Sequence, residues 1–114
     1  MKLTDIIQLT GARQVSGNET EKHNIKYAFS SDLMSDVLTL DTEHILLITG
    51  LANPQLIRTA EMADIEVVLL ARGKKATPEM IKLAEEVGLV LLETSFSIFR
   101  VSGILYENGL SPVY

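Results

Sequence analysis

Three short apolar runs decide the fold: ILLI at residues 45–48, VVLLA at 67–71 and LVLL at 89–92. None of them shows the polar alternation of a strand with one face in solvent, so each is predicted to be a strand covered on both faces. Each run ends in a polar turn that opens a predicted helix. Strands that alternate with helices form right-handed crossovers and a parallel sheet. The sequence therefore predicts an α/β fold, with a mostly parallel central sheet and helices above and below it.

The helices that follow the first two runs begin with the same capping pattern. Asn53 precedes Pro54, and Thr77 precedes Pro78. The Asn or Thr oxygen is expected to accept a bond from the first turn, and proline suits the first helical position because its missing N–H is not needed there. Gly88 is expected to end the second helix. The predicted apolar faces are Leu56, Ile57, Ala60 and Ala63 in the first helix and Met80, Ile81, Ala84 and Val87 in the second.

The patterns in the first third of the chain are shorter. They predict a helix that stops at Gly11, a brief strand over residues 12–15, a polar loop over 16–22 and a strand over 25–29. Thr4 or an adjacent residue is expected to cap the opening helix.

An amphipathic helix is predicted from Ser31 onward. Its apolar face consists of Leu33, Met34, Val37 and Leu38. Ser30 or Ser31 is expected to cap it, and Asp32 to complement the positive end of the helix dipole. Asp32 and Asp36 lie one turn apart, which suits either a magnesium ion or a docking partner. A solvated helix face is the simpler interpretation, so no metal ligand is assigned.

The last predicted helix, over residues 95–108, is apolar on more than one side. One stripe contains Phe96, Phe99, Gly103 and Tyr106, and a second contains Ile98, Val101 and Leu105. One stripe can face the sheet, and the other needs a cover, either the N-terminal helix or a second copy of the protein. A glycine inside a helix costs up to about 1 kcal/mol, so Gly103 indicates close packing. A homodimer contact is favoured over cover within the chain.

Composition excludes several classes of function. The chain of 114 residues is the size of one domain, predicted to span residues 1–114. A net charge of -5 opposes binding to a phosphate backbone, so no nucleic-acid partner is expected. The absence of cysteine excludes disulfides, thiolate catalysis and cysteine-held metal clusters. No signal peptide and no apolar run of about 20 residues is present, so we expect a cytoplasmic protein without a membrane partner.

The motifs of common catalytic sites are missing. The sequence contains neither a G-x-x-x-x-G-K-[ST] phosphate loop, nor a G-x-G-x-x-G dinucleotide motif, nor a G-x-S-x-G nucleophile motif. His23 and His44 lack the spacing of metal ligands and are interpreted as surface residues. No catalytic residue, metal or cofactor is therefore assigned, and the chain is predicted not to be an enzyme.

A ligand is expected at the carboxyl ends of the strands, because ligands of open parallel sheets bind where strand ends meet helix N-termini. Free amides and the positive helix end there suit a phosphate or a carboxylate, and Arg72 and Lys74 would add charge-assisted bonds. The candidate ligand-binding residues are Ser31, Asp32, Thr49, Gly50, Asn53, Arg72, Gly73, Lys74, Thr94 and Ser95. The alternative is that these residues only cap helices and fill turns.

Five segments form a familiar combination: ITG at residues 48–50, LLARG at 69–73, TPE at 77–79, AEEVG at 84–88 and TSFSIF at 94–99. Together they resemble a DRTGG domain, and the resemblance covers nearly the whole chain. The DRTGG domain is similar to the N-terminal domain of HPr kinase/phosphorylase. The segments SDLMSDVL at 31–38 and GILYENGL at 103–110 look closer still to the small stand-alone members encoded beside FeFe-hydrogenase subunits. The family is named after the motif Asp-Arg-Thr-Gly-Gly, which follows its third strand. This chain has GLANPQ at residues 50–55 in place of that motif.

The resemblance implies a three-layer α/β/α domain with a regulatory or assembly role. Kinase activity is not implied, because the kinase domain of HPr kinase is absent. The favoured hypothesis is a non-catalytic module, a homodimer that senses a small anionic ligand such as a nucleotide or a phosphorylated metabolite and acts through a protein partner. The alternative is a purely structural protein–protein adaptor without a small ligand. A small enzyme for phosphorylated substrates ranks last.

Overall fold

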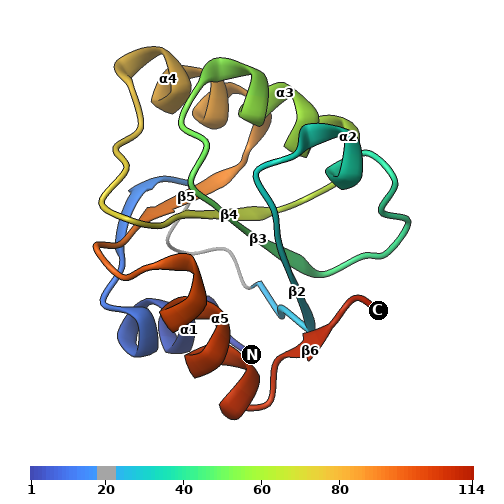
Figure 1. The fold of residues 1–114 in the computed structure, drawn as a ribbon. Coiled ribbons are helices and arrows are strands. Elements are labelled where there is room, and N and C mark those ends of the chain that lie inside the picture. Colours follow the sequence, from blue (N-terminus) through green and yellow to red (C-terminus); the bar gives the residue numbers. More distant parts are fainter. Residues whose placement is uncertain (18–22) are drawn as a thin grey trace.

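A six-stranded sheet with helices on both faces organises the chain in the computed structural model, which describes residues 1–17 and 23–114 (Figure 1). The strands are β1 (Arg13–Ser16), β2 (Tyr27–Ser30), β3 (Ile45–Thr49), β4 (Val67–Leu70), β5 (Val90–Glu93) and β6 (Ser111–Pro112). The helices are α1 (Leu3–Thr10), α2 (Met34–Val37), α3 (Pro54–Met62), α4 (Pro78–Val87) and α5 (Ile98–Glu107).

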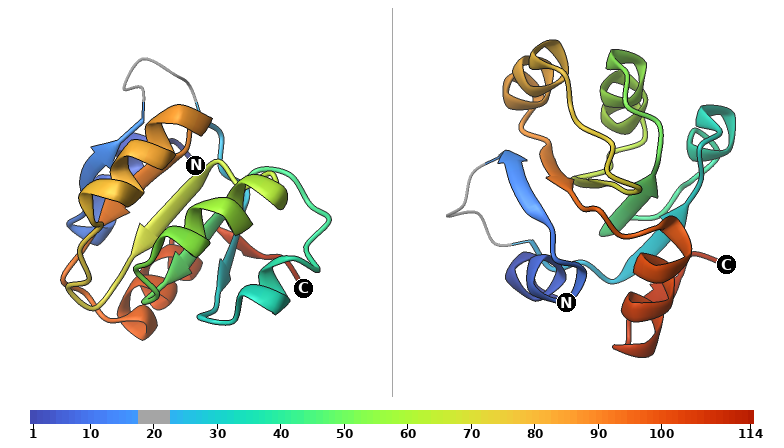
Figure 2. Two further views of the ribbon diagram at one scale, coloured as in Figure 1. Left: turned by 90° about the horizontal axis from the view of Figure 1, so that it is seen from above. Right: turned by 60° about the vertical axis from the view of Figure 1, so that its left-hand side comes forward.

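The path of the chain through the sheet decides which helix lies on which face. The strand order is β1-β5-β4-β3-β2-β6, and the strands from β2 to β6 pair in parallel, whereas β1 is antiparallel to β5. The chain steps in one direction from β2 to β5, so three right-handed crossovers place α2, α3 and α4 on one face. It then returns from β5 to β6, and the same handedness places α5 on the other face, beside α1 (Figure 2). The predicted three-layer α/β/α architecture is confirmed.

The central strands are covered on both faces, as their composition predicts. Every residue of β3, β4 and β5 is buried. Alternate side chains point to opposite layers. Leu46 and Ile48 pack with Val101 and Leu105 of α5, whereas Leu47 packs on the side of α2, α3 and α4.

The predicted caps of α3 and α4 are confirmed. Asn53 Oδ1 accepts a hydrogen bond from the Leu56 amide at 3.1 Å, and Thr77 Oγ1 accepts one from the Met80 amide at 3.1 Å. Gly88 ends α4 in the left-handed conformation. The expected cap of the opening helix is wrong, because Lys2 occupies the cap position and Thr4 lies in the first turn.

Several predicted boundaries differ from the structure, and the strand predicted over residues 12–15 is β1 at Arg13–Ser16. β2 begins at Tyr27 rather than at residue 25, and α5 begins at Ile98 rather than at residue 95. α2 is only one turn long, because Leu33 remains extended. The predicted polar loop over residues 16–22 falls mostly outside the described residues. None of the helices in the described part of the chain has the length and apolar character needed to cross a bilayer.

Candidate functional site

The candidate residues lie at one edge of the sheet, where β2, β3, β4 and β5 end. These four strands are parallel neighbours, so the turns that follow them are adjacent in space. We call the turns at residues 31–32, 49–53, 72–74 and 94–95 the carboxyl rim. Each turn leads toward a helix, as the sequence predicts.

Asp32 connects three of these turns. Its Oδ1 accepts hydrogen bonds from the Thr49 hydroxyl at 2.9 Å and from the Gly50 amide at 2.7 Å. Its Oδ2 lies 3.7 Å from Nη2 of Arg72. The sequence predicted that Asp32 would complement the dipole of the following helix. Instead, the carboxylate binds the end of β3, and α2 begins only at Met34, after the extended Leu33.

The surroundings of Asp32 keep its carboxylate ionised. The hydrogen bond from the Gly50 amide lowers the pKa of Asp32 most; partial burial opposes this effect. The Thr49 hydroxyl and the positive charges of Arg72 and Lys74 lower the pKa further. The net direction is below the ordinary carboxyl value, so Asp32 is a fixed negative charge at neutral pH.

Arg72 is held in place by its backbone and by Gly50. Its φ of 62° is left-handed, and its amide donates to the Phe96 carbonyl at 2.8 Å. The guanidinium lies against Gly50, where a Cβ would overlap it, and Nη2 donates to the Gly50 carbonyl at 3.4 Å. Because 49% of the side chain is exposed, solvent still reaches the guanidinium.

The neighbouring lysines differ in their partners. Lys75 Nζ lies 3.7 Å from Oε1 of Glu93, a buried carboxylate that also pairs with Arg13 at 3.1 Å and accepts from the Ala76 amide at 2.7 Å. Lys74 is exposed, and its charge acts on Asp32. The carboxyl rim therefore presents two cations, Arg72 and Lys74, and Asp32 balances only one of them.

Other candidate side chains bond within the fold. Asn53 caps α3, and the buried Thr94 hydroxyl donates to the Thr10 carbonyl at 2.6 Å. Ser31 Oγ accepts from the Leu33 amide at 3.0 Å. The bonds of Asn53 and Ser31 are those of a cap and a turn, the alternative that the sequence left open, whereas the Thr94 bond ties its turn to the end of α1. Gly73 donates its amide to the Thr94 carbonyl at 3.0 Å, and Ser95 is exposed beside it.

The histidines and acidic residues do not form a metal centre in the described ranges 1–17 and 23–114, since no group of three or more His, Asp or Glu residues there is placed to hold an ion. The interpretation of His23 as a surface residue is wrong. Its side chain is only 7% exposed, and Nδ1 lies 3.1 Å from Oε2 of Glu66.

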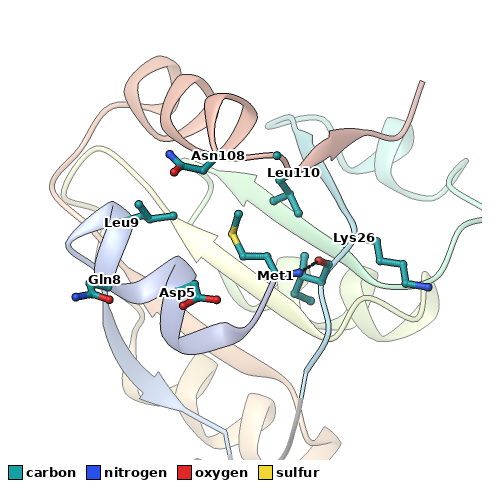
Figure 3. A pocket seen from close by; sticks show the side chains of 9 residues that line it. Met1, Asp5, Gln8, Leu9, Lys26, Asn108 and Leu110 are labelled. Atoms are coloured by element: carbon teal, nitrogen blue, oxygen red, sulfur yellow. Dashed lines mark hydrogen bonds between the residues drawn. The ribbon is translucent and has the colours of Figure 1, made fainter.

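A large cavity opens at the opposite edge of the sheet, near the amino ends of β2 and β6. It has a volume of about 660 Å³ and lies between α1 and the end of α5 (Figure 3). Asp5, Gln8, Lys26 and Asn108 supply polar groups to its wall. The sequence contained no signal for it, because the lining residues come from three separate segments that share no pattern.

A second cavity, of about 280 Å³, lies between β2, α5 and the C-terminal tail. Phe29, Tyr106 and Tyr114 are among its lining residues, and the rings of Phe29 and Tyr114 are 6.0 Å apart between centroids. Ser30 and Ser102 also line it, and their hydroxyl oxygens are 2.8 Å apart. Most of the residues that line this cavity are apolar, and Ser102, Leu105 and Tyr106 of α5 form part of its wall.

No protein-family model matches the chain, and no match was found among curated proteins. A solved structure with a similar fold contains the CBS and DRTGG domains of the regulatory region of a Clostridium perfringens pyrophosphatase, in complex with the activator diadenosine tetraphosphate. The TM-score is 0.77 and the sequence identity 17%, over 97% of this chain and 47% of that chain. The chain thus spans about half of that structure and has a DRTGG-like fold.

Proposed function

We propose that this chain is a non-catalytic regulatory module that senses a small anion, such as a nucleotide or a phosphorylated metabolite, at the carboxyl rim. The observation that carries the proposal is the half-exposed guanidinium of Arg72, held over Gly50 beside the exposed Lys74. Guanidinium and ammonium groups in this arrangement bind phosphate oxygens through charge-assisted bonds. Further support comes from the pyrophosphatase regulatory region, which has a similar fold and was solved with a nucleotide activator.

Asp32 gives this proposed site a means of response. The carboxylate already accepts hydrogen bonds from the Gly50 amide and the Thr49 hydroxyl. The fold itself therefore supplies one anion at the carboxyl rim. A phosphate that binds Arg72 competes with Asp32 for the guanidinium. The distance between Asp32 and that guanidinium is 3.7 Å, longer than the hydrogen bonds that Asp32 accepts from Thr49 and Gly50. Displacing Arg72 from Asp32 changes the turn that leads into α2. The signal reaches a protein partner through that part of the surface.

The test is a thermal-shift and calorimetric panel with inorganic phosphate, AMP, ATP and diadenosine tetraphosphate. A ligand present at about 100 times its Kd stabilises the fold by roughly 2.7 kcal/mol, which raises the Tm by several degrees in a domain of this size. Arg72→Ala and Lys74→Ala should each reduce the shift strongly. Lys82→Ala, which removes an exposed lysine from α4, is the matched control and should keep it.

The second candidate function is a structural adaptor without a small ligand. It is favoured by the many internal bonds of the rim and by exposed apolar side chains such as Leu33 and Met62, which are 62% and 68% exposed. Absence of a thermal shift with every anion in the panel would overturn the sensor and leave the adaptor. In both cases we propose that the working unit is a homodimer.

A further inference from the structure

Helix α5 carries an aromatic face that residues 1–17 and 23–114, the described part of the chain, leave exposed. Phe99 is 89% exposed and Tyr106 is 66% exposed. They are seven positions apart in the sequence, so they lie on the same side of the helix, two turns apart. Val101 and Leu105 are buried on the opposite side, against the sheet. Large apolar side chains exposed together on one face mark an interaction surface.

Gly103 lies between these two aromatic residues on the exposed face. A Cβ at this position would meet no atom of the described residues within 4 Å, so none of their contacts requires a glycine there. The glycine nevertheless costs up to about 1 kcal/mol relative to alanine inside a helix. Its absence of a side chain allows the backbone of a second helix to approach closely.

Two opposite charges flank Gly103 on its other side. At about 100° per residue, Arg100 and Glu107 form a row parallel to the row of Phe99 and Tyr106. Both charged residues are exposed, Arg100 in the first turn of α5 and Glu107 at its end. The guanidinium of Arg100 lies 3.6 Å from the ring centroid of Phe96, which holds it near the surface of the helix.

We propose that this face is the interface of a homodimer, in which the α5 helices of two copies pack antiparallel and cross at Gly103. A two-fold axis beside Gly103 sets Arg100 of one copy opposite Glu107 of the other, and Phe99 opposite Tyr106. Both rows are then self-complementary, as an isologous interface requires. A parallel arrangement would place like charges together. This charge pattern specifies a second copy of the chain as the partner.

The neighbouring surface enlarges this contact. A stable dimer buries about 800 Å² on each partner, more than the face of one helix about 15 Å long provides. Tyr114 is 89% exposed and lines the same 280 Å³ cavity as Tyr106, so the apolar surface continues from α5 to the C-terminal tail. This inference specifies the homodimer named above and does not involve Arg72 or Lys74.

Sedimentation velocity and light scattering over a concentration series test the interface. We expect a dimer for the wild type, and a dimer Kd raised about 30-fold or more by Phe99→Glu, the loss typical of a central aromatic residue. Met62→Glu on α3 is the matched control, because Met62 is also apolar and is 68% exposed but lies on the opposite face of the sheet; this variant should remain dimeric. Arg72→Ala should remain dimeric too, which separates this test from that of the anion site.

Charge reversal and cross-linking locate the contact. Arg100→Glu and Glu107→Arg should each weaken the dimer, and the double variant should restore it, because the opposite charges then face each other again. Because the chain has no cysteine, Gly103→Cys introduces a single thiol, which on oxidation should give a disulfide-linked dimer. Met62→Cys should not form a disulfide-linked dimer on oxidation. A monomeric wild type at millimolar concentration, or a dimer indifferent to Phe99→Glu and to charge reversal, would overturn the proposal.

Discussion

At the scale of single residues, Gly50 and Arg72 depend on each other. The glycine leaves space for the guanidinium, and the left-handed backbone at Arg72 directs the side chain back over β3. The turn between β4 and α4 is also tied to the turn after β5 through the amides of Arg72 and Gly73. Backbone hydrogen bonds therefore fix where the Arg72 side chain begins, and the guanidinium is held in place more firmly than that of an ordinary surface arginine.

Gly50→Ala should displace the guanidinium of Arg72, because the new methyl group occupies its place. The far end of an arginine moves easily and a surface ion pair contributes little, so the free energy of unfolding should fall by about 1 kcal/mol or less in urea titrations. In an Arg72→Ala background the same substitution should have almost no effect, since the overlap no longer exists. Equal effects in the two backgrounds would show that Gly50 is needed for another reason.

Asp32→Asn should lower stability at neutral pH and lose this effect in acid. The pKa of Asp32 is lowered in the folded state, so the stabilisation is present above the unfolded carboxyl value of about 4 and disappears as the pH falls through the folded value. Because the side chain is 46% exposed, solvent screens the interaction, and we expect less than about 1 kcal/mol. Urea titrations from pH 7 to pH 2 measure it. A difference that persists unchanged at pH 2 would contradict this assignment.

At the scale of elements, local capping determines where α3 and α4 begin, whereas α2 depends on a distant contact. The Asn-Pro and Thr-Pro pairs start their helices through bonds to residues three positions later. The periodicity of residues 33–38 predicts a longer helix than the one turn observed. The carboxylate of Asp32 binds the end of β3, and the extended backbone at Leu33 delays the start of α2.

Asn53→Ala should reduce the free energy of unfolding by about 1 kcal/mol, the usual effect of losing a side-chain N-cap. The Leu56 amide then loses its side-chain partner at the start of α3. Thermal and urea unfolding measure the loss, with Gln55→Ala, an exposed position in the same first turn, as the control. An unchanged stability would show that water replaces the cap without cost.

At the scale of the whole molecule, the sheet brings distant segments together. Arg13 and Glu93 pair across the contact between β1 and β5, although 80 positions separate them. β6, which no sequence pattern indicated, pairs with β2 over only two residues. The return of the chain from β5 to β6 places α5 on the face opposite to α3 and α4, and this leaves the face of Phe99 and Tyr106 in solvent.

The sequence by itself determined the α/β class, the three central strands, the caps of α3 and α4, and the edge at which the candidate residues gather. These features depend on hydrophobic periodicity and on capping, which act between residues close in the chain. Only the tertiary structure decided the strand order at both edges, the partner of Asp32, the support of Arg72 by Gly50 and the stripe of α5 that stays exposed. Those features depend on contacts between segments far apart in the chain, whose pairing no local pattern encodes.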